Sequence, residues 1–285
     1  NAIFKPAFSA NETRTFAAVS WFVVAVSDSF KPSIRFLFSG TLAIGLAFLF
    51  GQSINFSRPE WFAILIFGVC QNTIYLGLNF VAMQWIDASL AATIASLLPL
   101  VVTMFLWAFF KEKLNSLGLV GLLVGLLGLS LIINATIPTK LNLIGIVLCL
   151  VGVVALATAT IIVRNSINKN ILMMIGLQML VGSISLFPLS LTFEVWEINW
   201  TTQLIASFLY TAIFPGLIAT FIWFKLLHFI GPLKASAFHF LNPFFGVMIA
   251  HLVLSEKLLQ QQLLGVLLVT MAIISLQLSK ARKIK

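Results

Sequence analysis

Residues 241–258 read LNPFFGVMIAHLVLSEKL, and residues 97–114 read LLPLVVTMFLWAFFKEKL. Each stretch is an apolar run with a proline near its start, Pro243 or Pro99, and Glu-Lys-Leu at its end. Thirteen positions separate the proline from the glutamate in both stretches. Because the two stretches lie 144 residues apart, the sequence predicts that one structural unit occurs twice in the chain.

The composition excludes a water-soluble domain. Of the 285 residues, 60% are hydrophobic and only 9% are charged, whereas soluble domains contain about 45–50% apolar and about 25% charged residues. The apolar runs last roughly 18–24 residues, the length of a helix that crosses a hydrocarbon core of about 30 Å. They lack the strict alternation of a membrane β-barrel strand. We therefore expect an all-α integral membrane protein, with the lipid bilayer as its surroundings.

The length allows about ten transmembrane helices. The first has a short apolar centre, and an alternative interpretation makes residues 15–26 a re-entrant or interfacial piece. The expected spans are 13–30, 33–50, 61–84, 87–110, 116–134, 142–164, 171–193, 203–228, 233–254 and 260–279.

The repeat predicts how the two halves are related. At the 144-residue offset, Gly121 aligns with Gly265, and the match covers the third to fifth spans against the eighth to tenth. Each half holds five spans, and an odd number reverses the direction of the second half. We therefore expect two five-helix inverted repeats, 13–134 and 141–279, as in many secondary transporters. A basic tail, 280–285, follows them.

The net charge of +9 is explained by membrane topology, not by a nucleic-acid partner. With the C-terminus inside, only Lys31, Lys140 and Lys257 lie outside among the basic residues of loops and ends. The even number of spans then places both termini in the cytoplasm, in a plasma or inner membrane. The basic residues expected inside are Arg58, Lys111, Lys113, Arg164, Lys169, Lys234, Lys280, Arg282, Lys283 and Lys285.

The two prolines are expected to bend their helices. A proline lacks an N–H and frees the carbonyl four residues earlier, here that of Ala95 for Pro99 and that of His239 for Pro243. A free carbonyl in lipid has to face protein or a wet cavity. The prolines therefore predict helix kinks or hinges around a shared cavity; a packing kink without a ligand role is the alternative.

Polar residues within the spans predict which faces point inward. Gln71, Tyr75 and Asn79 follow the i, i+4, i+8 spacing of one helical stripe, and Ser236, His239 and Asn242 share a face of the ninth span. Such stripes either bind a solute or hydrogen-bond other helices. We expect the remaining substrate-binding residues to be Thr93, Ser96, Thr158, Thr211 and Trp223.

Charged residues within the spans are few. Every Asp and Glu lies near a span end or in a loop, so a buried acid that holds a cation or drives a proton pump is disfavoured. Glu112 adjoins two lysines and is interpreted as a helix-end pair. Arg35 and Lys225 lie inside their spans, and snorkelling toward the interface is the first interpretation. If either side chain faces a cavity instead, its positive charge favours an anionic or carboxylate-bearing solute.

No sequence motif indicates catalysis or a cofactor. There is no P-loop, no His-Glu-x-x-His and no Gly-x-Ser-x-Gly. Cys70 and Cys149 lie in apolar runs without metal-ligand spacing and are expected to be core residues. We expect no enzyme activity, no catalytic residues, no metal and no cofactor.

The repeated segments carry a family resemblance. Residues 77–129, GLNFVAMQWIDASLAATIASLLPLVVTMFLWAFFKEKLNSLGLVGLLVGLLGL, and residues 221–274, FIWFKLLHFIGPLKASAFHFLNPFFGVMIAHLVLSEKLLQQQLLGVLLVTMAII, resemble the EamA-type ten-helix members of the drug/metabolite transporter superfamily. In that family each half closes with a mid-span proline, a helix-end glutamate and a glycine-rich final helix. The resemblance implies a solute carrier, often an exporter of metabolites, with a central cavity between the halves.

We therefore expect a secondary transporter that exports small polar or amphipathic metabolites, amino acid-like solutes first, by alternating access. The two halves would rock against each other. A non-transporting membrane scaffold or receptor is the alternative, and a membrane-embedded lipid-modifying enzyme is a weaker one. A monomer is favoured over a dimer, because the glycines of the fifth span are expected to pack within the chain: Gly118, Gly121, Gly125 and Gly128.

Overall fold

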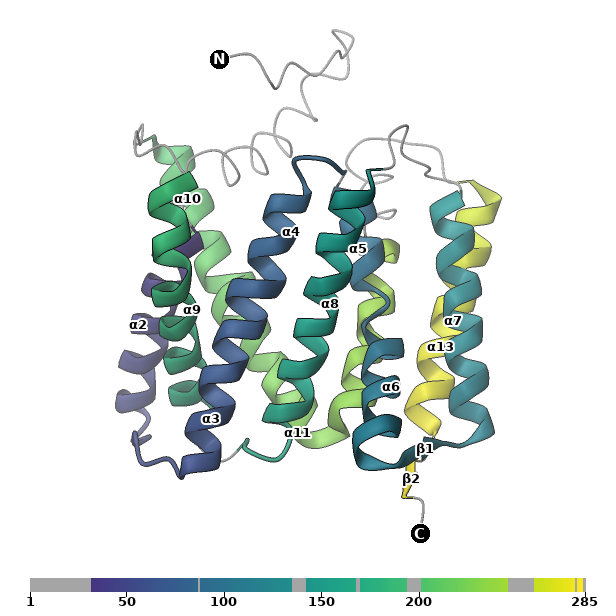
Figure 1. Cartoon of the computed structure of the whole chain (residues 1–285), viewed down its shortest axis with the longest axis horizontal. Coiled ribbons are helices and arrows are strands. Elements are labelled where there is room, and N and C mark those ends of the chain that lie inside the picture. Colours follow the sequence, from purple (N-terminus) through teal and green to yellow (C-terminus); the bar gives the residue numbers. More distant parts are fainter. Residues whose placement is uncertain are drawn as a thin grey trace, which may run out of the picture.

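The fold is that of a computed structural model (Figure 1). Several expected features lie outside the part of the chain that the structure describes: the first span, 13–30, the acidic residue Glu256, and the basic residues Lys31, Lys140, Lys169, Lys257, Lys280 and Lys285. The described residues are 32–86, 88–134, 142–167, 170–193, 201–245, 259–279 and 281–283.

Helices make up almost all of the described chain. Three of the expected spans are built from consecutive segments, in which α-helix alternates with wider π-helix (η1, η2) or tighter 3₁₀-helix (η3). The helices are α2 (Pro32–Leu49), α3 (Arg58–Phe67), η1 (Gly68–Leu76), α4 (Gly77–Ala82), α5 (Ala88–Ala95), α6 (Leu98–Phe110), α7 (Ser116–Asn134), α8 (Leu143–Val163), α9 (Ile171–Phe193), α10 (Thr202–Thr211), η2 (Ala212–Ile218), α11 (Ala219–Ser236), η3 (Ala237–Phe240) and α13 (Gln260–Leu278). Two short strands, β1 (Glu112–Leu114) and β2 (Ala281–Lys283), pair antiparallel.

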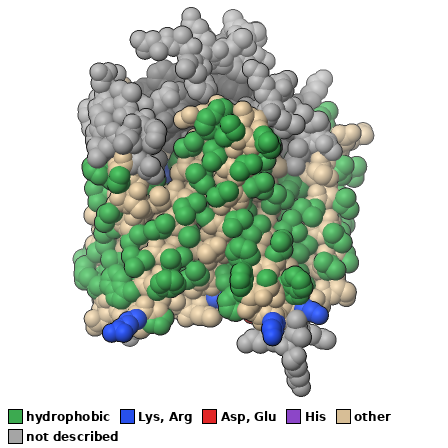
Figure 2. All heavy atoms as spheres, in the orientation of Figure 1, with side chains coloured by type: hydrophobic (Ala, Val, Ile, Leu, Met, Phe, Trp, Pro, Cys, Tyr) green, Lys and Arg blue, Asp and Glu red, His purple; other side chains and the backbone are tan. Residues whose placement is uncertain are grey.

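The helices stand side by side and run between two ends of the molecule (Figure 1). Hydrophobic side chains cover much of the face in Figure 2. Two shorter apolar helices, 33–49 and 116–132, accompany the long ones. The chain is therefore an all-α, multi-pass membrane protein. Among the described residues, six helices are long and apolar enough to cross a membrane: 58–82, 90–110, 143–163, 171–188, 204–245 and 260–278.

The stretch 204–245 contains 42 residues, about twice the length that one crossing needs. Its helix is broken at Gly231, which has φ 79° and ψ 168°, a conformation that glycine adopts without steric cost. Pro232 follows, and the chain turns back at the lower end of Figure 1. The expected span 203–228 and the described part of the expected span 233–254, residues 233–245, lie on either side of this break.

Local sequence signals explain where several helices begin. Glu60 accepts a 2.6 Å hydrogen bond from the backbone N–H of Ser57 at the start of α3. Thr201 accepts one from the N–H of Leu204 at 3.2 Å, at the start of α10. These capping bonds satisfy backbone donors that have no partner within the helix. Ser57 and Thr201 are 144 residues apart.

Two helix pairs approach so closely that only glycine fits between them. A Cβ added to Gly128 in α7 would lie 2.7 Å from the carbonyl oxygen of Gly265 in α13, and one added to Gly265 would lie 2.7 Å from that of Gly128. In the same way, Gly40 in α2 and Gly176 in α9 each face the carbonyl of the other at 2.9 Å. Small residues at helix interfaces allow this packing in a membrane. The glycines of α7 thus pack against α13 of the same chain.

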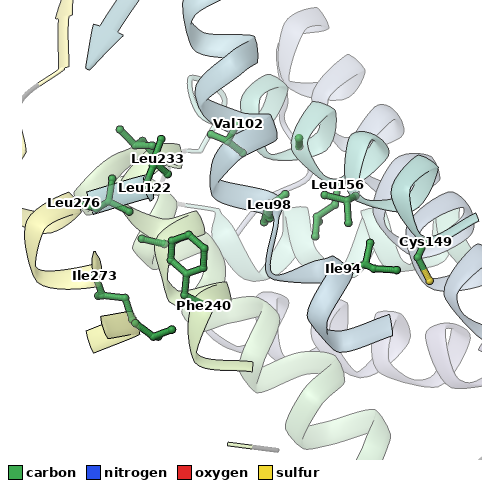
Figure 3. Close-up of a cluster of buried hydrophobic side chains, with 14 of the residues drawn as sticks. Ile94, Leu98, Val102, Leu122, Cys149, Leu156, Leu233, Phe240, Ile273 and Leu276 are labelled. Atoms are coloured by element: carbon green, nitrogen blue, oxygen red, sulfur yellow. The ribbon is translucent and has the colours of Figure 1, made fainter. Parts of the chain in front are cut away.

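The apolar core forms two clusters. One contains Leu98 of α6, Phe240 of η3 and Leu276 of α13, which Figure 3 shows together. The other contains Phe67 of α3 and Phe224 of α11, whose ring centroids are 4.9 Å apart. Trp223 of α11 packs against both clusters and so lies where they meet.

Lys and Arg gather at the lower end of the molecule (Figure 2). There Glu112 pairs with Arg164, after α8, at 3.2 Å, and the Arg164 guanidinium lies 4.0 Å from the ring centroid of Phe110. The helix-end pairing expected between Glu112 and its neighbouring lysines is therefore wrong. The sequence suggested the adjacent lysines as partners of Glu112. Arg164 pairs with it instead, through a planar guanidinium that stacks on the Phe110 ring. Strand β2 of the basic tail pairs with β1 at the same end.

The close glycine contact predicts a matched pair of variants. Gly128→Ala places a methyl group 2.7 Å from a backbone oxygen, so we expect a destabilisation of about 1–3 kcal/mol. An alanine at Gly45 in α2 would meet nothing within 4 Å and should be neutral or stabilising by up to about 1 kcal/mol. Thermal unfolding of both variants in detergent checks this, and equal melting temperatures would contradict the packing.

Candidate functional site

The predicted site residues lie in, or directly after, seven described helical segments. None of them is fully exposed: Ser96 and Thr211 are buried, and the others are partly buried. Gln71 and Tyr75 lie in η1, Asn79 in α4, Thr93 in α5, Ser96 in the turn after α5, Thr158 in α8, Thr211 in α10, Trp223 in α11, His239 in η3 and Asn242 just beyond it.

Trp223 and His239 are in direct contact. Their ring centroids lie 5.1 Å apart and their planes meet at 74°, an edge-to-face arrangement. The two residues come from opposite sides of the break at Gly231, so the turn brings them together. The indole Nε1 of Trp223 is buried and has no hydrogen-bond partner. A buried indole N–H usually finds a partner, and this donor lacks one within the described chain.

Gln71 and its neighbour Asn72 differ in how their amides are satisfied. The Asn72 Nδ2 donates to Gln178 of α9, at 2.7 Å to Oε1 and at 3.1 Å to the backbone oxygen. The Gln71 Oε1 is buried and accepts no hydrogen bond. Asn72 therefore joins two helices, while Gln71 presents a free acceptor. Sequence analysis selected Gln71 but did not foresee the Asn72–Gln178 contact.

Four of the predicted residues donate to their own helices. Ser96 bonds to Ala92 at 2.9 Å, Thr158 to Val154 at 2.8 Å, and Thr211 to Ser207 at 2.9 Å. The Asn79 Nδ2 donates to the Tyr75 carbonyl at 2.7 Å. Hydroxyls often form such local bonds within helices. Any contribution of these residues to a site is then mainly as acceptors.

Both expected kink prolines are buried and follow an interruption of the α-helix. A turn at 96–97 separates α5 from α6 and precedes Pro99, which lies in the first turn of α6. In the second half, η3 precedes Pro243. A proline in the first helical turn needs no hydrogen-bond acceptor for its nitrogen. The hinge role of the two prolines stays a prediction.

Arg35 is a residue that the predicted site did not include. It lies in the first turn of α2, and its Nε is buried without a hydrogen-bond partner. The guanidinium carbon is 5.8 Å from the ring centroid of Phe80 in α4, so the side chain reaches a neighbouring helix. The signal in the sequence is a charged residue inside an expected span. In the described chain, no group of three His, Cys, Asp or Glu residues could hold a metal.

The described fold and site define a multi-pass α-helical membrane protein with unpartnered polar atoms buried between its helices. The sequence model of the EamA-like transporter family matches residues 15–134 and 143–277. The chain therefore belongs to this family, which is part of the drug/metabolite transporter superfamily.

Individual relatives agree with this assignment. The chain is 24% identical over 273 residues to the uncharacterized transporter YvbV of Bacillus subtilis (strain 168), and this alignment covers 93% of this chain and 89% of YvbV. It is 27% identical over 260 residues to an uncharacterized transporter of Archaeoglobus fulgidus, which covers 90% and 91% of the two chains. One crystal structure shares the fold with a TM-score of 0.74, at 13% identity over 93% of each chain. The sequence relatives are named as transporters, not as enzymes.

The two neighbouring amides give a stability test of the site. Gln71→Leu removes an acceptor that bonds nothing, so we expect the stability to be unchanged or slightly raised. Asn72→Leu removes two hydrogen bonds and should cost about 1–3 kcal/mol. Thermal unfolding of the ligand-free protein compares the two, and equal losses would show that Gln71 is a packing residue.

Proposed function

We propose that this EamA-family transporter is a ten-helix secondary transporter that exports small polar or amphipathic metabolites, amino acid-like solutes first, by alternating access. One observation carries the proposal. The buried Gln71 Oε1 is a free acceptor and the buried Trp223 Nε1 is a free donor. Unsatisfied polar groups inside a bilayer are costly, and a bound polar solute or its water would satisfy both.

Structural equivalence at an offset of 144 residues supports an inverted repeat. The π-helical segments η1 and η2 begin at Gly68 and Ala212, which are 144 residues apart. Such segments are rare and recur at functional sites. The family model also matches two successive stretches of the chain.

The contacts between α7 and α13 have the symmetry that a two-fold axis requires. Such an axis turns each contact between the halves into a second contact. In the second contact, each residue is replaced by its equivalent in the other half, 144 positions away. Gly128 faces the carbonyl of Gly265, and Gly121 faces that of Ala272 at 3.2 Å from its added Cβ. Because Gly121 aligns with Gly265 and Gly128 aligns with Ala272, these two contacts exchange under the repeat. Five spans in each repeat, with 13–30 as the first, complete the ten.

The same helix pairs bear on how the transporter moves. The pair α2 and α9, like the pair α7 and α13, joins one helix from each expected repeat through glycine contacts. Rocking 13–134 against 141–279 as rigid halves would separate both pairs. The proposed motion instead uses the interruptions before Pro99 and Pro243 as hinges, where a turn and a 3₁₀-helix replace the α-helical hydrogen-bonding pattern.

The chemistry of the site favours a solute with both polar and apolar parts. Gln71 offers an amide, His239 an imidazole, and Trp223 and Tyr75 aromatic faces. The two acidic residues in the described chain, Glu60 and Glu112, lie at helix ends, so neither holds a cation within the bundle. Energy would come from the solute gradient, from exchange, or from proton linkage through His239.

The distribution of basic residues supports a cytoplasmic location for the lower end. Arg58 begins α3, Arg164 follows α8, and Lys234 donates to Gln277 near the end of α13. Strand β2 places Arg282 and Lys283 beside β1 at this end. Basic residues favour the cytoplasmic side of short loops. This is the orientation proposed for the C-terminus in a plasma or inner membrane.

Efflux from proteoliposomes tests the proposal. Vesicles loaded with labelled amino acids and small metabolites should release one chemical class with saturable kinetics. His239→Ala should slow that release about tenfold or more, because it removes a site side chain and the ring against Trp223. Thr270→Ala is the matched control, since Thr270 is exposed on α13 and bonds only its own helix, at 2.9 Å to Val266.

Three outcomes separate the interpretations. Saturable release that is slowed only by His239→Ala supports the carrier and its site. Release that His239→Ala leaves unchanged keeps the carrier and removes His239 from the mechanism. No release of any class, from protein that is folded by thermal unfolding, contradicts transport and favours the scaffold or receptor.

A further inference from the structure

Arg35 directs its charge into the helix bundle. Its guanidinium carbon lies 5.0 Å from the ring centroid of Phe36 in the same helix and 5.8 Å from that of Phe80 in α4. Its Nε is buried and donates to nothing. A snorkelling arginine extends along its own helix into the headgroups, whereas this side chain lies against another helix. The contact with Phe80 favours a direction into the bundle over snorkelling for Arg35.

No carboxylate neutralises Arg35 within the described residues. Glu60 bonds both the N–H and the hydroxyl of Ser57, and Glu112 pairs with Arg164. Glu60 lies near the start of α3, and the length of α2 puts roughly 20 Å between that end and Arg35. An unpaired guanidinium inside a bilayer is costly and marks a functional site by default.

The surroundings of Arg35 also favour a negative charge. Ser33, in the same helical turn, is only 1% exposed, and its hydroxyl has no partner. The turn is held to α9, because Ser183 donates to the Ser33 carbonyl at 2.7 Å. The start of a helix carries a partial positive charge. Arg35, Ser33 and the helix end thus present donors and positive potential together.

Arg35 lies beside the continuous helix η1–α4, which carries Gln71, Tyr75 and Asn79 of the candidate site. Phe80 belongs to α4, and α4 continues η1 without a break. Tyr75 of η1 and Asn79 of α4 precede Phe80 in this continuous helix. Gln71 is nine residues from Phe80, which is roughly 13 Å along a helix. A solute that moved from Gln71 along this helix toward the end of α4 would pass the Arg35 guanidinium.

We infer that Arg35 recognises an anionic group, a carboxylate first, on the translocation route of this transporter. The inference rests on the proposed function and narrows its substrates to organic anions and zwitterions with a free carboxylate. A guanidinium binds a carboxylate through two parallel hydrogen bonds. Amines that lack a carboxylate would be excluded. The phosphate of an anionic lipid has similar chemistry, and the experiment below distinguishes it from a solute.

A binding experiment tests the inference independently of transport. The full chain in phosphatidylcholine nanodiscs is titrated with alanine, leucine and phenylalanine, with the corresponding amines, and with the corresponding acids that lack the amino group. Binding raises the melting temperature. We expect the carboxylates to stabilise the protein and the amines to have no effect. Arg35→Gln should weaken carboxylate binding roughly 10- to 100-fold.

Two further variants keep the experiment informative. Lys225→Gln removes one positive charge whose nitrogen lies near Phe221 and Phe229 of its own helix, and it should leave binding unchanged. If Arg35→Gln does not fold, Arg35→Lys serves instead. It keeps the charge without the planar fork and should weaken the carboxylates several-fold.

The outcomes separate this inference from the proposed function. Arg35-dependent carboxylate binding without saturable efflux supports the inference and contradicts the carrier. Saturable efflux that is equal for acids and amines, or unchanged in the Arg35 variants, keeps the carrier and overturns the inference. Absence of stabilisation by every carboxylate also overturns it. So does stabilisation that occurs only when phosphatidylglycerol is added, because the anion would then be a lipid headgroup.

Discussion

A polar atom inside a bilayer has no water to bond, so it needs a partner from the protein or from a ligand. Most polar groups of the described helices meet this constraint within the chain. Ser39 of α2 donates to the Ala212 carbonyl at 2.9 Å, where η2 widens around Pro215, and Asn72 bonds Gln178. The groups left over are few, and Gln71, Trp223 and Arg35 are among them. We propose that a solute binds at these exceptions.

Glycine packing determines how the helices that carry these groups are arranged. Glycines that face each other's carbonyls, where an added Cβ would lie only 2.7 or 2.9 Å from the oxygen, join α7 to α13 and α2 to α9. Each pair takes one helix from each half of the sequence, so the halves interlock and do not form separate domains. Helices that are interrupted, α5–α6 and α11–η3, lie between these pairs in the chain and are the parts that we propose to move. Trp223 and His239 sit on one of these interrupted segments.

Much of the fold could be predicted from the sequence. Long apolar runs predict membrane helices, and the turn at Gly231 follows from a Gly-Pro pair between two such runs. The π-helical segments could not be predicted, because they depend on which helix packs alongside. The same limit applies to the site. Residue type and spacing select Gln71 and Asn72 equally, but only the neighbouring α9 decides that Asn72 is satisfied and Gln71 is not. Arg35 was missed as a site residue because its direction depends on Phe80, 45 positions away.

The central claim is that a polar solute completes the hydrogen bonding of Gln71 and Trp223. Cryo-electron microscopy of the full chain in nanodiscs, with the solute that gives the strongest saturable efflux, tests it most directly. The account predicts density for that solute, or for water that it holds, within about 3.5 Å of both Gln71 Oε1 and Trp223 Nε1. Dry, apolar packing against both atoms, with the solute bound elsewhere, would contradict the account.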